Sequence, residues 1–458
     1  IDYTVKRTWR GASFRTFVKR FGGFDDIAEQ SLIVKGGADF ARPSANATAA
    51  PLTVVHTNLP GIVREQNLPP GRYLFEQKVR LVPEITAWDY GATIEATMAA
   101  CATNAPLASA KARALVAGKA SVAEKVRAIR DFIATQIRVA GPAYSDLPLD
   151  LLSPADATFE SGYGHSADVA ILTRAMLAAA GVPSRFVFID SGRAASDADD
   201  VVEGCDLFDA ILVAVDDDDA TYYVNDGSQY SELRATSCEG MMAADLAARK
   251  WVAIQADPGY EACVSNAFEM DVAANGDAIL SITTEYRGAA AEGFRRLYRE
   301  LQPEDRRRHV LEVVSAFSRK AKLDGPFETD VEAYPATRKF RIRIPGWGVV
   351  QDGFMSVRLP GSDGAAISPR YGRRQLPFWR GMTHRFDDIL VLRFAEGIEE
   401  AALLPETVRH ATPDGSTRFM TISEASTTSD GRVEVTVKRS GELTRAFFGP
   451  EIYEPFAA

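Results

Sequence analysis

The sequence predicts an α+β protein of several domains, with a central mixed domain between β-rich or β-sandwich domains. Its 458 residues exceed what one hydrophobic core usually spans, so we expect three or four domains. Apolar residues recur with helical spacing from Thr93 to Arg138, whereas the segments before and after this region alternate as strands do. We therefore predict domains over residues 1–90, 91–262, 263–362 and 363–458.

Composition and charge argue against two classes of protein. The net charge is −10, and no run of Lys and Arg is long enough to neutralise a nucleic-acid backbone, so no nucleic-acid partner is expected. No stretch approaches the roughly 18 apolar residues of a membrane-spanning helix, because even Val169–Val182 contains Arg174. We expect no transmembrane segment in this chain.

The first 90 residues read mainly as β structure. Alternating apolar residues indicate strands over Tyr3–Trp9, Leu52–Thr57 and Tyr73–Pro83, while Phe17–Ile33 has helical spacing. A tract rich in Pro, Ala, Ser and Asn between Ala41 and Pro51 indicates a loop.

Two helices are predicted at the start of the central domain. A helix rich in small residues is expected over Thr93–Leu115. After Gly118, Ser121 and Glu124 have the spacing of a capping box that begins a second helix. Its apolar residues share one face, which we expect to be buried: Val122, Val126, Ile129, Ile133 and Ile137.

The segment Ser153–Asp190 organises the central domain. It reads as a Gly-rich turn, a buried helix and a short strand, and the turn places His165 and Ser166 where the helix begins. A side chain at that end faces unpaired backbone N–H groups, which stabilise a thiolate or an oxyanion. The position therefore suits a nucleophile.

An antiparallel meander is predicted next, over Arg185–Asp190, Leu207–Val215 and Thr221–Asp226, so the centre of the chain is α+β. Four aspartates between the last two segments indicate a solvated hairpin turn rather than a calcium site, because no EF-hand spacing is present. Residues 241–254 read as a further helix.

The β-rich segment after the central domain resembles the start of the chain. When Arg287–Gly288 is set on Arg10–Gly11, Phe294 matches Phe17 within similar apolar frames. This match predicts that residues 263–362 repeat a strand–helix–strand motif of residues 1–90. From Tyr371 onwards, strands and turns predict a terminal antiparallel sandwich.

The spacing of the cysteines and histidines does not predict a metal site. The four cysteines have no CxxC spacing, which argues against zinc, and Cys205 and Cys238 flank a predicted strand pair and are candidates for a disulfide. Four histidines lie in different predicted elements without paired ligand spacing: His56, His309, His384 and His410. No metal or other cofactor is expected.

Aromatic residues near Pro and Gly have two interpretations. Trp347, Trp379 and Phe378 lie in predicted loops, where they would form a platform for a sugar or a peptide or would pack in a core or between domains. We favour packing.

The segment Gly164–Asp168 is similar to parts of two known motifs. The run Gly-His-Ser resembles the G-x-S-x-G nucleophile elbow of serine hydrolases, in which a small residue follows two positions after the serine. Here that position is Asp168, and the preceding Thr158–Gly164 is polar rather than an apolar strand. Both departures argue against the elbow.

The longer match is to the transglutaminase-like (papain-related) superfamily. Its segment resembles G-x-C-x-D/E-x-A-x-L-L, followed by a leucine, then Gly-Ile-Pro-Ala-Arg. This chain carries the pattern, with serine in place of cysteine, at Gly164, Ser166, Asp168, Ala170, Leu172, Leu177, Gly181, Val182, Pro183 and Arg185. The whole chain is similar to multidomain bacterial proteins in which such a domain is flanked by β-rich domains.

The resemblance implies a Cys-His-Asp mechanism, and this chain departs from it. Residue-by-residue matching puts Ser166 at the nucleophile, Ala210 at the histidine, and Asn225 or Asp226 at the aspartate. Two of the three groups are therefore missing. If the match is right, the side chains of Ser166 and Ala210 should lie within several ångströms of each other.

The residues around these positions are expected to line the old cleft: Tyr163, Gly164, His165 and Asp209. We expect a non-catalytic pseudoenzyme with a degenerate triad that binds a peptide, a glycan or a protein partner. The alternative is an active amide-directed acyl transferase or protease with an atypical site. The resemblance, not the composition, implies a periplasmic or secreted location in the cell envelope.

Overall fold

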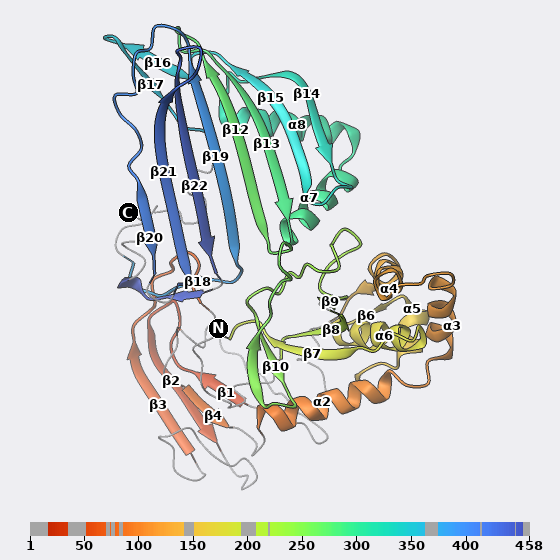
Figure 1. Ribbon diagram of the computed structural model, residues 1–458. Helices are drawn as coiled ribbons and strands as arrows, with labels where there is room; N and C mark the ends of the chain where they lie inside the picture. The colour runs from red at the N-terminus through yellow and green to blue at the C-terminus, as the bar shows by residue number, and fades with distance from the viewer. Residues whose placement is uncertain are drawn as a thin grey trace.

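The computed structural model describes residues 17–34, 52–69, 74, 78–81, 86–141, 151–193, 208–218, 220–361, 374–412, 415–444 and 446–451. The protein is an α+β multidomain chain. A central domain of helices packed on a small sheet lies beside a long sheet formed by the second half of the chain, and the β1–β4 region lies below the end of that long sheet (Figure 1).

Helices of the central domain surround one buried helix, α6. They are α2 (Ala87–Cys101), α3 (Pro106–Leu115), α4 (Val122–Gln136), α5 (Ala155–Ser161) and α6 (Ser166–Ala179). Helix α6 contacts each of the other four as well as the sheet, which explains why ten of its 14 residues are buried. The predicted capping box of Ser121 and Glu124 is confirmed at the start of α4.

The helix predicted over Thr93–Leu115 is two helices. Helix α2 begins earlier, at Ala87, where Thr86 caps it by accepting from the Asp89 N–H. It ends at Cys101, and Asn104 adopts a positive φ of 51° before Pro106 begins α3. Proline is favoured in the first turn of a helix, so it marks a new start rather than continuation.

The sheet of the central domain has the order β11-β10-β7-β8-β9 and is antiparallel throughout. Its strands are β7 (Arg185–Asp190), β8 (Ala210–Asp217), β9 (Ala220–Tyr223), β10 (Met242–Asp245) and β11 (Lys250–Ala253). The predicted meander is confirmed. The helix predicted over 241–254 is wrong: these residues form the β10–β11 hairpin, because pairing of β10 with the exposed edge of β7 overrides their weak helical preference.

The two faces of this sheet have different neighbours. Phe186, Phe188, Ile211 and Val213 face α6 and join the core of the helices. The alternate residues face the opposite side, where they pack with Cys238 and Ile254: Val187, Ile189, Leu212 and Ala214. This alternation fixes which residues of β8 can approach the beginning of α6.

The second half of the chain forms one eight-stranded sheet, with the order β14-β15-β13-β12-β19-β22-β21-β20 (Figure 1). The strands are β12 (Cys263–Val272), β13 (Ala278–Arg287), β14 (Lys322–Asp330), β15 (Ala336–Ile344), β19 (His384–Phe394), β20 (Val408–Ala411), β21 (Thr417–Thr427) and β22 (Val433–Leu443). Strands β12 and β19 pair in parallel over ten residues, and the other neighbours are antiparallel.

The predicted boundary between residues 362 and 363 therefore does not separate two β units, because β12 and β19 share one sheet and one core.

Helices α7 (Ala289–Glu300) and α8 (Pro303–Phe317) connect β13 to β14. The hairpin of β16 (Gly348–Gln351) and β17 (Phe354–Val357) extends from one end of the sheet (Figure 1).

The described part of the N-terminal region consists of two strand pairs. Strand β1 (Phe17–Arg20) pairs with β4 (Lys78–Leu81), and β2 (Ile27–Val34) pairs with β3 (Leu52–Leu59). The helix predicted over 17–33 is wrong, because the Gly22–Gly23 turn breaks the segment and each half pairs as a strand.

The structure does not support the proposed repeat at the one matched pair that it describes in both segments. Phe294 lies in α7, whereas Phe17, which matched it, lies in a strand. Residues 1–16, with Arg10 and Gly11, lie outside the described residues.

The end of the chain returns to the N-terminal strands. Strand β18 (Phe378–Arg380) pairs with β23 (Ala446–Phe448), and the Trp379 N–H donates to the Asn67 carbonyl at 2.8 Å. The Glu65 carboxylate accepts from the backbone N–H groups of Gln375 and Leu376.

Candidate functional site

The beginning of α6 is shaped by a tight turn. Strand β6 (Tyr163–Gly164) pairs in parallel with β5 (Arg138–Val139), and Gly162 ends α5 with a φ of 70°. A Cβ on Gly164 would lie 2.8 Å from the Asp168 Cβ, so only glycine lets the chain pass this close to the helix. Ser166 is the first residue of α6, as predicted, and is half-buried.

Asp168 links this turn to the segment before α5. Its side chain is buried, and one carboxylate oxygen, Oδ1, accepts from the Ser153 backbone N–H at 2.7 Å. The other oxygen, Oδ2, accepts from the Ser153 hydroxyl at 3.1 Å and lies 3.2 Å from His165 Nε2. Hydrogen bonds to the charged form stabilise a buried carboxylate, so Ser153 makes this burial tolerable.

His165 is a buried helix cap, not a group open to a cleft. Its Nδ1 accepts from the Asp168 backbone N–H at 3.4 Å, and its Nε2 faces the Asp168 carboxylate. Burial lowers the pKa of His165, and the Asp168 charge opposes this shift only in part. Both ring nitrogens therefore lie within 3.4 Å of Asp168 atoms, although Nε2 makes no hydrogen bond, and no hydrogen bond joins the ring to Ser166 in the described part of the chain.

Ala210 does not face α6. Its side chain packs with the cluster on the opposite side of the sheet, whereas Ile211 and Val213 lie on the α6 side. The expectation that Ala210 would stand beside Ser166 is wrong. A shift of one residue along a strand moves a side chain to the other face of the sheet. Matching the sequence to the family motif does not distinguish Ala210 from its neighbours to within one residue.

Asn225 holds the edge of β8 after β9 has ended. Its Nδ2 donates to the Ile211 carbonyl at 2.8 Å, and its Oδ1 accepts from the Val213 N–H. The side chain thus replaces two backbone partners of a strand that stops at Tyr223. Both the amide nitrogen and the amide oxygen of Asn225 are therefore bonded to the β8 backbone.

Asp226 is fixed by a neighbouring loop. Its carboxylate accepts from the Thr236 hydroxyl at 2.5 Å and from the Ser237 backbone N–H at 2.9 Å. Burial raises the pKa of Asp226 to about 6, although these hydrogen bonds oppose the shift and the charge of Glu292 adds to it. In the described part of the chain, the hydrogen bonds of Asn225 and Asp226 thus go to β8 and to Thr236–Ser237, and none of them joins either residue to Ser166.

Of the other residues expected to line a cleft, Tyr163 is exposed, Gly164 is buried and Asp209 is exposed. Asp209 accepts from the backbone N–H and the hydroxyl of Ser191. It thereby joins the residue before β8 to the residue after β7. Between Tyr163 and Asp168, all of which the structure describes, Tyr163 and half-buried Ser166 are the residues that present side-chain surface.

Residues 109–209 match the sequence model of the transglutaminase-like superfamily. The chain carries a transglutaminase-like domain. Its fold is similar to a crystal structure described as "a putative protease" from Parabacteroides distasonis, with a TM-score of 0.54 and 16% identity over 96% of this chain and 71% of that chain. No curated protein sequence matches the chain.

The transglutaminase-like domain contains one imidazole. All five histidines of the chain lie among the described residues, and the other four are on β3, α8, β19 and β20, outside this domain: His56, His309, His384 and His410. No group of three His, Cys, Asp or Glu side chains suited to a metal ion occurs in the described part of the chain. None of the described helices is long and apolar enough to span a bilayer.

The thiol of Cys101, whose pKa the Asp168 charge affects, is not activated. Cys101, at the end of α2, donates its S–H to the Leu152 carbonyl at 3.8 Å. Burial raises the pKa of Cys101, and the negative charge of Asp168 raises it further. A catalytic thiolate needs the opposite shift. Cys205 lies outside the described residues, so its pairing with Cys238 stays a prediction.

Sequence matching missed two residues: Ser153, which holds Asp168, and Asp156, which holds the start of α3. Asp156 on α5 accepts from the Leu107 and Ala108 N–H groups at 3.0 and 2.9 Å and thereby caps α3 from outside. The sequence offered one signal, because Ala105 is a poor cap and left the start of α3 without a local acceptor.

The pKa of Asp226 predicts a pH dependence of stability. A carboxyl pKa near 6 in the fold and near 3.9 in the unfolded chain means that the folded state binds more protons between these values. Stability should therefore fall as pH rises from about 4 to about 6 and then level off. Asp226→Asn should flatten this decline, as measured by urea unfolding at several pH values. An equally steep decline in the variant would contradict the assignment.

Proposed function

We propose that the transglutaminase-like domain is non-catalytic and binds a partner at the beginning of α6. The observation that carries the proposal is the position of His165, because the single imidazole of this domain is buried against Asp168, with Nδ1 accepting from its N–H and Nε2 3.2 Å from its carboxylate. A serine hydroxyl without a general base is a poor nucleophile at neutral pH. The helix end retains its binding chemistry without the groups for acyl transfer.

A peptide segment of another protein is the ligand that this surface suits best. The backbone N–H and the hydroxyl of half-buried Ser166, the first residue of α6, can donate to peptide carbonyl oxygens. Tyr163 is 59% exposed beside them and offers an aromatic face with a polar end. A glycan would use the same donors, so it is the main competing ligand. The location that we propose, the periplasm or the exterior of the cell, follows from the resemblance to bacterial envelope proteins.

An activity screen tests the absence of catalysis. We expect the unmodified protein to show no turnover of glutaminyl peptides with amine donors and no peptide hydrolysis. Ser166→Cys should remain inactive as well, because restoring the thiol does not restore a base, and general-base catalysis contributes about 10²–10⁴-fold.

Ser161→Cys, which places an exposed thiol at the end of α5, is the matched control for nonspecific thiol reactivity. Turnover by the unmodified protein, or by Ser166→Cys above Ser161→Cys, would support the alternative of an active acyl transferase or protease with an atypical site.

A further inference from the structure

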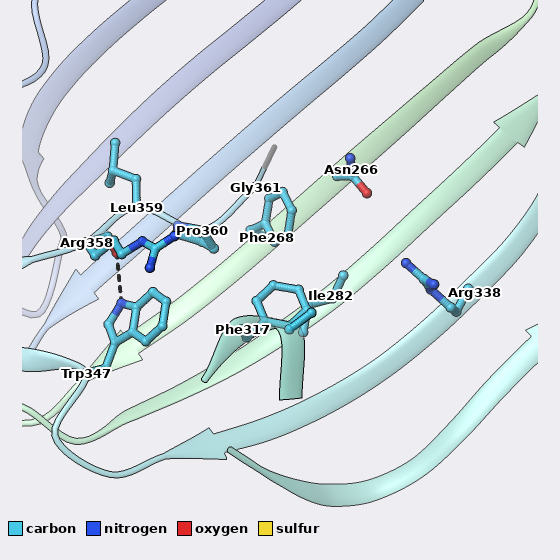
Figure 2. A pocket seen from close by; sticks show the side chains of 11 residues that line it. Asn266, Phe268, Ile282, Phe317, Arg338, Trp347, Arg358, Leu359, Pro360 and Gly361 are labelled. Atoms are coloured by element: carbon cyan, nitrogen blue, oxygen red, sulfur yellow. Dashed lines mark hydrogen bonds between the residues drawn. The ribbon is translucent and has the colours of Figure 1, made fainter. Parts of the chain in front are cut away.

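A pocket on the long sheet is divided by its own aromatic walls. Its volume is about 220 Å³, and Figure 2 shows the guanidinium ends of Arg338 and Arg358 on opposite sides of Phe268 and Phe317. The Trp347 indole donates to the Arg358 carbonyl at 2.8 Å and so holds one wall in place. One small ligand does not reach both cations, so this pocket does not define a ligand. The central sheet offers a different kind of site.

The central sheet ends in a strand with an open edge. Strand β9 is the last in the order β11-β10-β7-β8-β9 and pairs with β8 in antiparallel register. The Val224 N–H donates to the Val213 carbonyl, so Val224 and, two residues earlier, Tyr222 direct their backbone groups towards β8. Successive residues of an antiparallel strand alternate in this respect. Thr221 and Tyr223 therefore direct their N–H and carbonyl groups away from β8.

These four backbone groups have no hydrogen-bond partner in the described part of the chain. The adjoining edge of β8 is closed, because the Asn225 side chain bonds to the Ile211 carbonyl and the Val213 N–H. Thr221 and Tyr223 are half-buried, and both line an open hollow. A strand edge with unpaired N–H and carbonyl groups accepts a further strand.

The hollow beside β9 suits the side chains of such a strand. Its volume is about 760 Å³, and it lies on the side of the sheet away from α6. Apolar residues of β7, β10 and the end of β11 form part of its lining: Val187, Ala243, Val252 and Ile254. Directly paired residues share one face of a sheet, so residues paired with Thr221 and Tyr223 would direct their side chains towards this hollow. Apolar side chains are expected at these two positions.

The turn before β9 has excess negative charge. Arg185 donates to the Asp216 carboxylate at 3.1 and 3.2 Å and so neutralises one of its aspartates. Asp217, which accepts from the Tyr222 hydroxyl at 2.9 Å, and Asp218 form no ion pair in the described part of the chain. Lys or Arg side chains of an added strand would meet these carboxylates at the end of β9. The turn therefore favours a basic partner over an acidic one.

We propose that β9 is the docking edge for an extended, basic segment of another protein, which adds a sixth strand to the five-stranded sheet. The segment runs antiparallel to β9, places apolar side chains opposite Tyr223 and Thr221, and places Lys or Arg beside the turn. The proposal uses neither Ser166 nor Tyr163, so it does not depend on the function proposed for the beginning of α6.

A short peptide tests the docking edge on the full chain. In acetyl-Thr-Phe-Thr-Val-Lys-Lys-amide, the proposed register pairs the Phe with Tyr223 and the Val with Thr221. Fluorescence anisotropy of the labelled peptide should show saturable binding with a Kd below about 1 mM. Replacing both Lys residues with Glu should weaken this binding, because it places like charges together at the turn.

Methylation of backbone nitrogens in the peptide tests the strand pairing itself. N-methylation of both Phe and Val removes the two N–H groups that would donate to β9, and should weaken binding about tenfold or more. N-methylation of the Thr between them is the matched control. Its N–H faces away from β9 in the proposed register, so this peptide should bind about as well as the unmodified one.

A protein variant gives the same comparison from the other side. Thr221→Pro removes an outward N–H that β8 does not use, and should weaken peptide binding about tenfold. Thr221→Val is the matched control, because it also lacks the hydroxyl that donates to Asp216 but keeps the N–H. If Thr221→Pro does not fold, the N-methylated peptides decide the question on the unmodified protein.

Four results would overturn the proposal. These are no binding of the peptide up to about 1 mM, equal weakening by the two kinds of N-methylation, tighter binding of the Glu peptide, and full binding by folded Thr221→Pro. A dimer in analytical ultracentrifugation that Thr221→Pro dissociates would assign the edge to a second copy of this chain, and would overturn the proposal as well.

Discussion

Replacing Gly288 with alanine is expected to destabilise the protein by about 3 kcal/mol or more. Gly288 precedes α7 with a φ of 56° and a ψ of −136°, a conformation open mainly to glycine. A Cβ there would lie 2.5 Å from the Tyr260 carbonyl oxygen and 2.6 Å from the Ala262 nitrogen. Both are backbone atoms, so the clash cannot be relieved by a change of side-chain rotamer. Thermal and urea unfolding would measure the loss.

Gly293→Ala is the matched control for Gly288→Ala. Gly293 lies within α7, and a Cβ there would have no heavy atom within 4 Å. Alanine is favoured over glycine in a helix, so this variant should be about 0.5–1 kcal/mol more stable than the unmodified protein. Similar effects of the two substitutions would show that the close approach at Gly288 is not what makes it necessary.

Arg295→Met is expected to cost about 3–5 kcal/mol, because it removes one partner of a buried ion pair and leaves the other without its counter-charge. Arg295 is 7% exposed and lies 2.8 Å from Glu232. It also donates to the Tyr230 carbonyl at 3.1 Å and the Ala333 carbonyl at 2.8 Å. These contacts fasten the transglutaminase-like domain to the long sheet.

Urea unfolding and limited proteolysis would measure the effect of Arg295→Met, which should also expose the connection between the two domains to cleavage. Arg299→Met is the control, since Arg299 is half exposed and pairs with exposed Glu332. Exposed pairs contribute at most about 1 kcal/mol, so this variant should be close to the unmodified protein. Equal losses from the two substitutions would contradict a special role for the buried arginine.

Local signals in the sequence predicted the elements that local interactions stabilise. The capping box of Ser121 and Glu124, the start of α6 at Ser166 and the strand over Arg185–Asp190 are all present. Each depends on residues a few positions apart, such as a cap, a turn or an apolar period. The motif from Gly164 to Arg185 also located the transglutaminase-like domain correctly.

The misplaced elements are those that long-range pairing decides. Residues 17–33 and 241–254 have helical spacing, but strands β4, β3 and β7 pair with them and outweigh that preference. The position of Ala210 failed for a related reason. The register of β8 against β7 determines which residues of β8 face α6. The sequence alone does not give this register, so an assignment to β8 can be wrong by one residue.

The parallel pairing of β12 with β19 has a consequence for the order in which the protein is made. Asn266 and Asp388, which meet across these strands, are 122 positions apart. A ribosome releases β12 and its hairpin partner β13 long before β19 emerges. Until then the outer edge of β12 has its backbone groups without a neighbouring strand, and such edges invite pairing with other chains. The sheet is therefore completed late in synthesis. Until β19 emerges, the exposed edge of β12 is the part of the sheet most open to pairing with other chains.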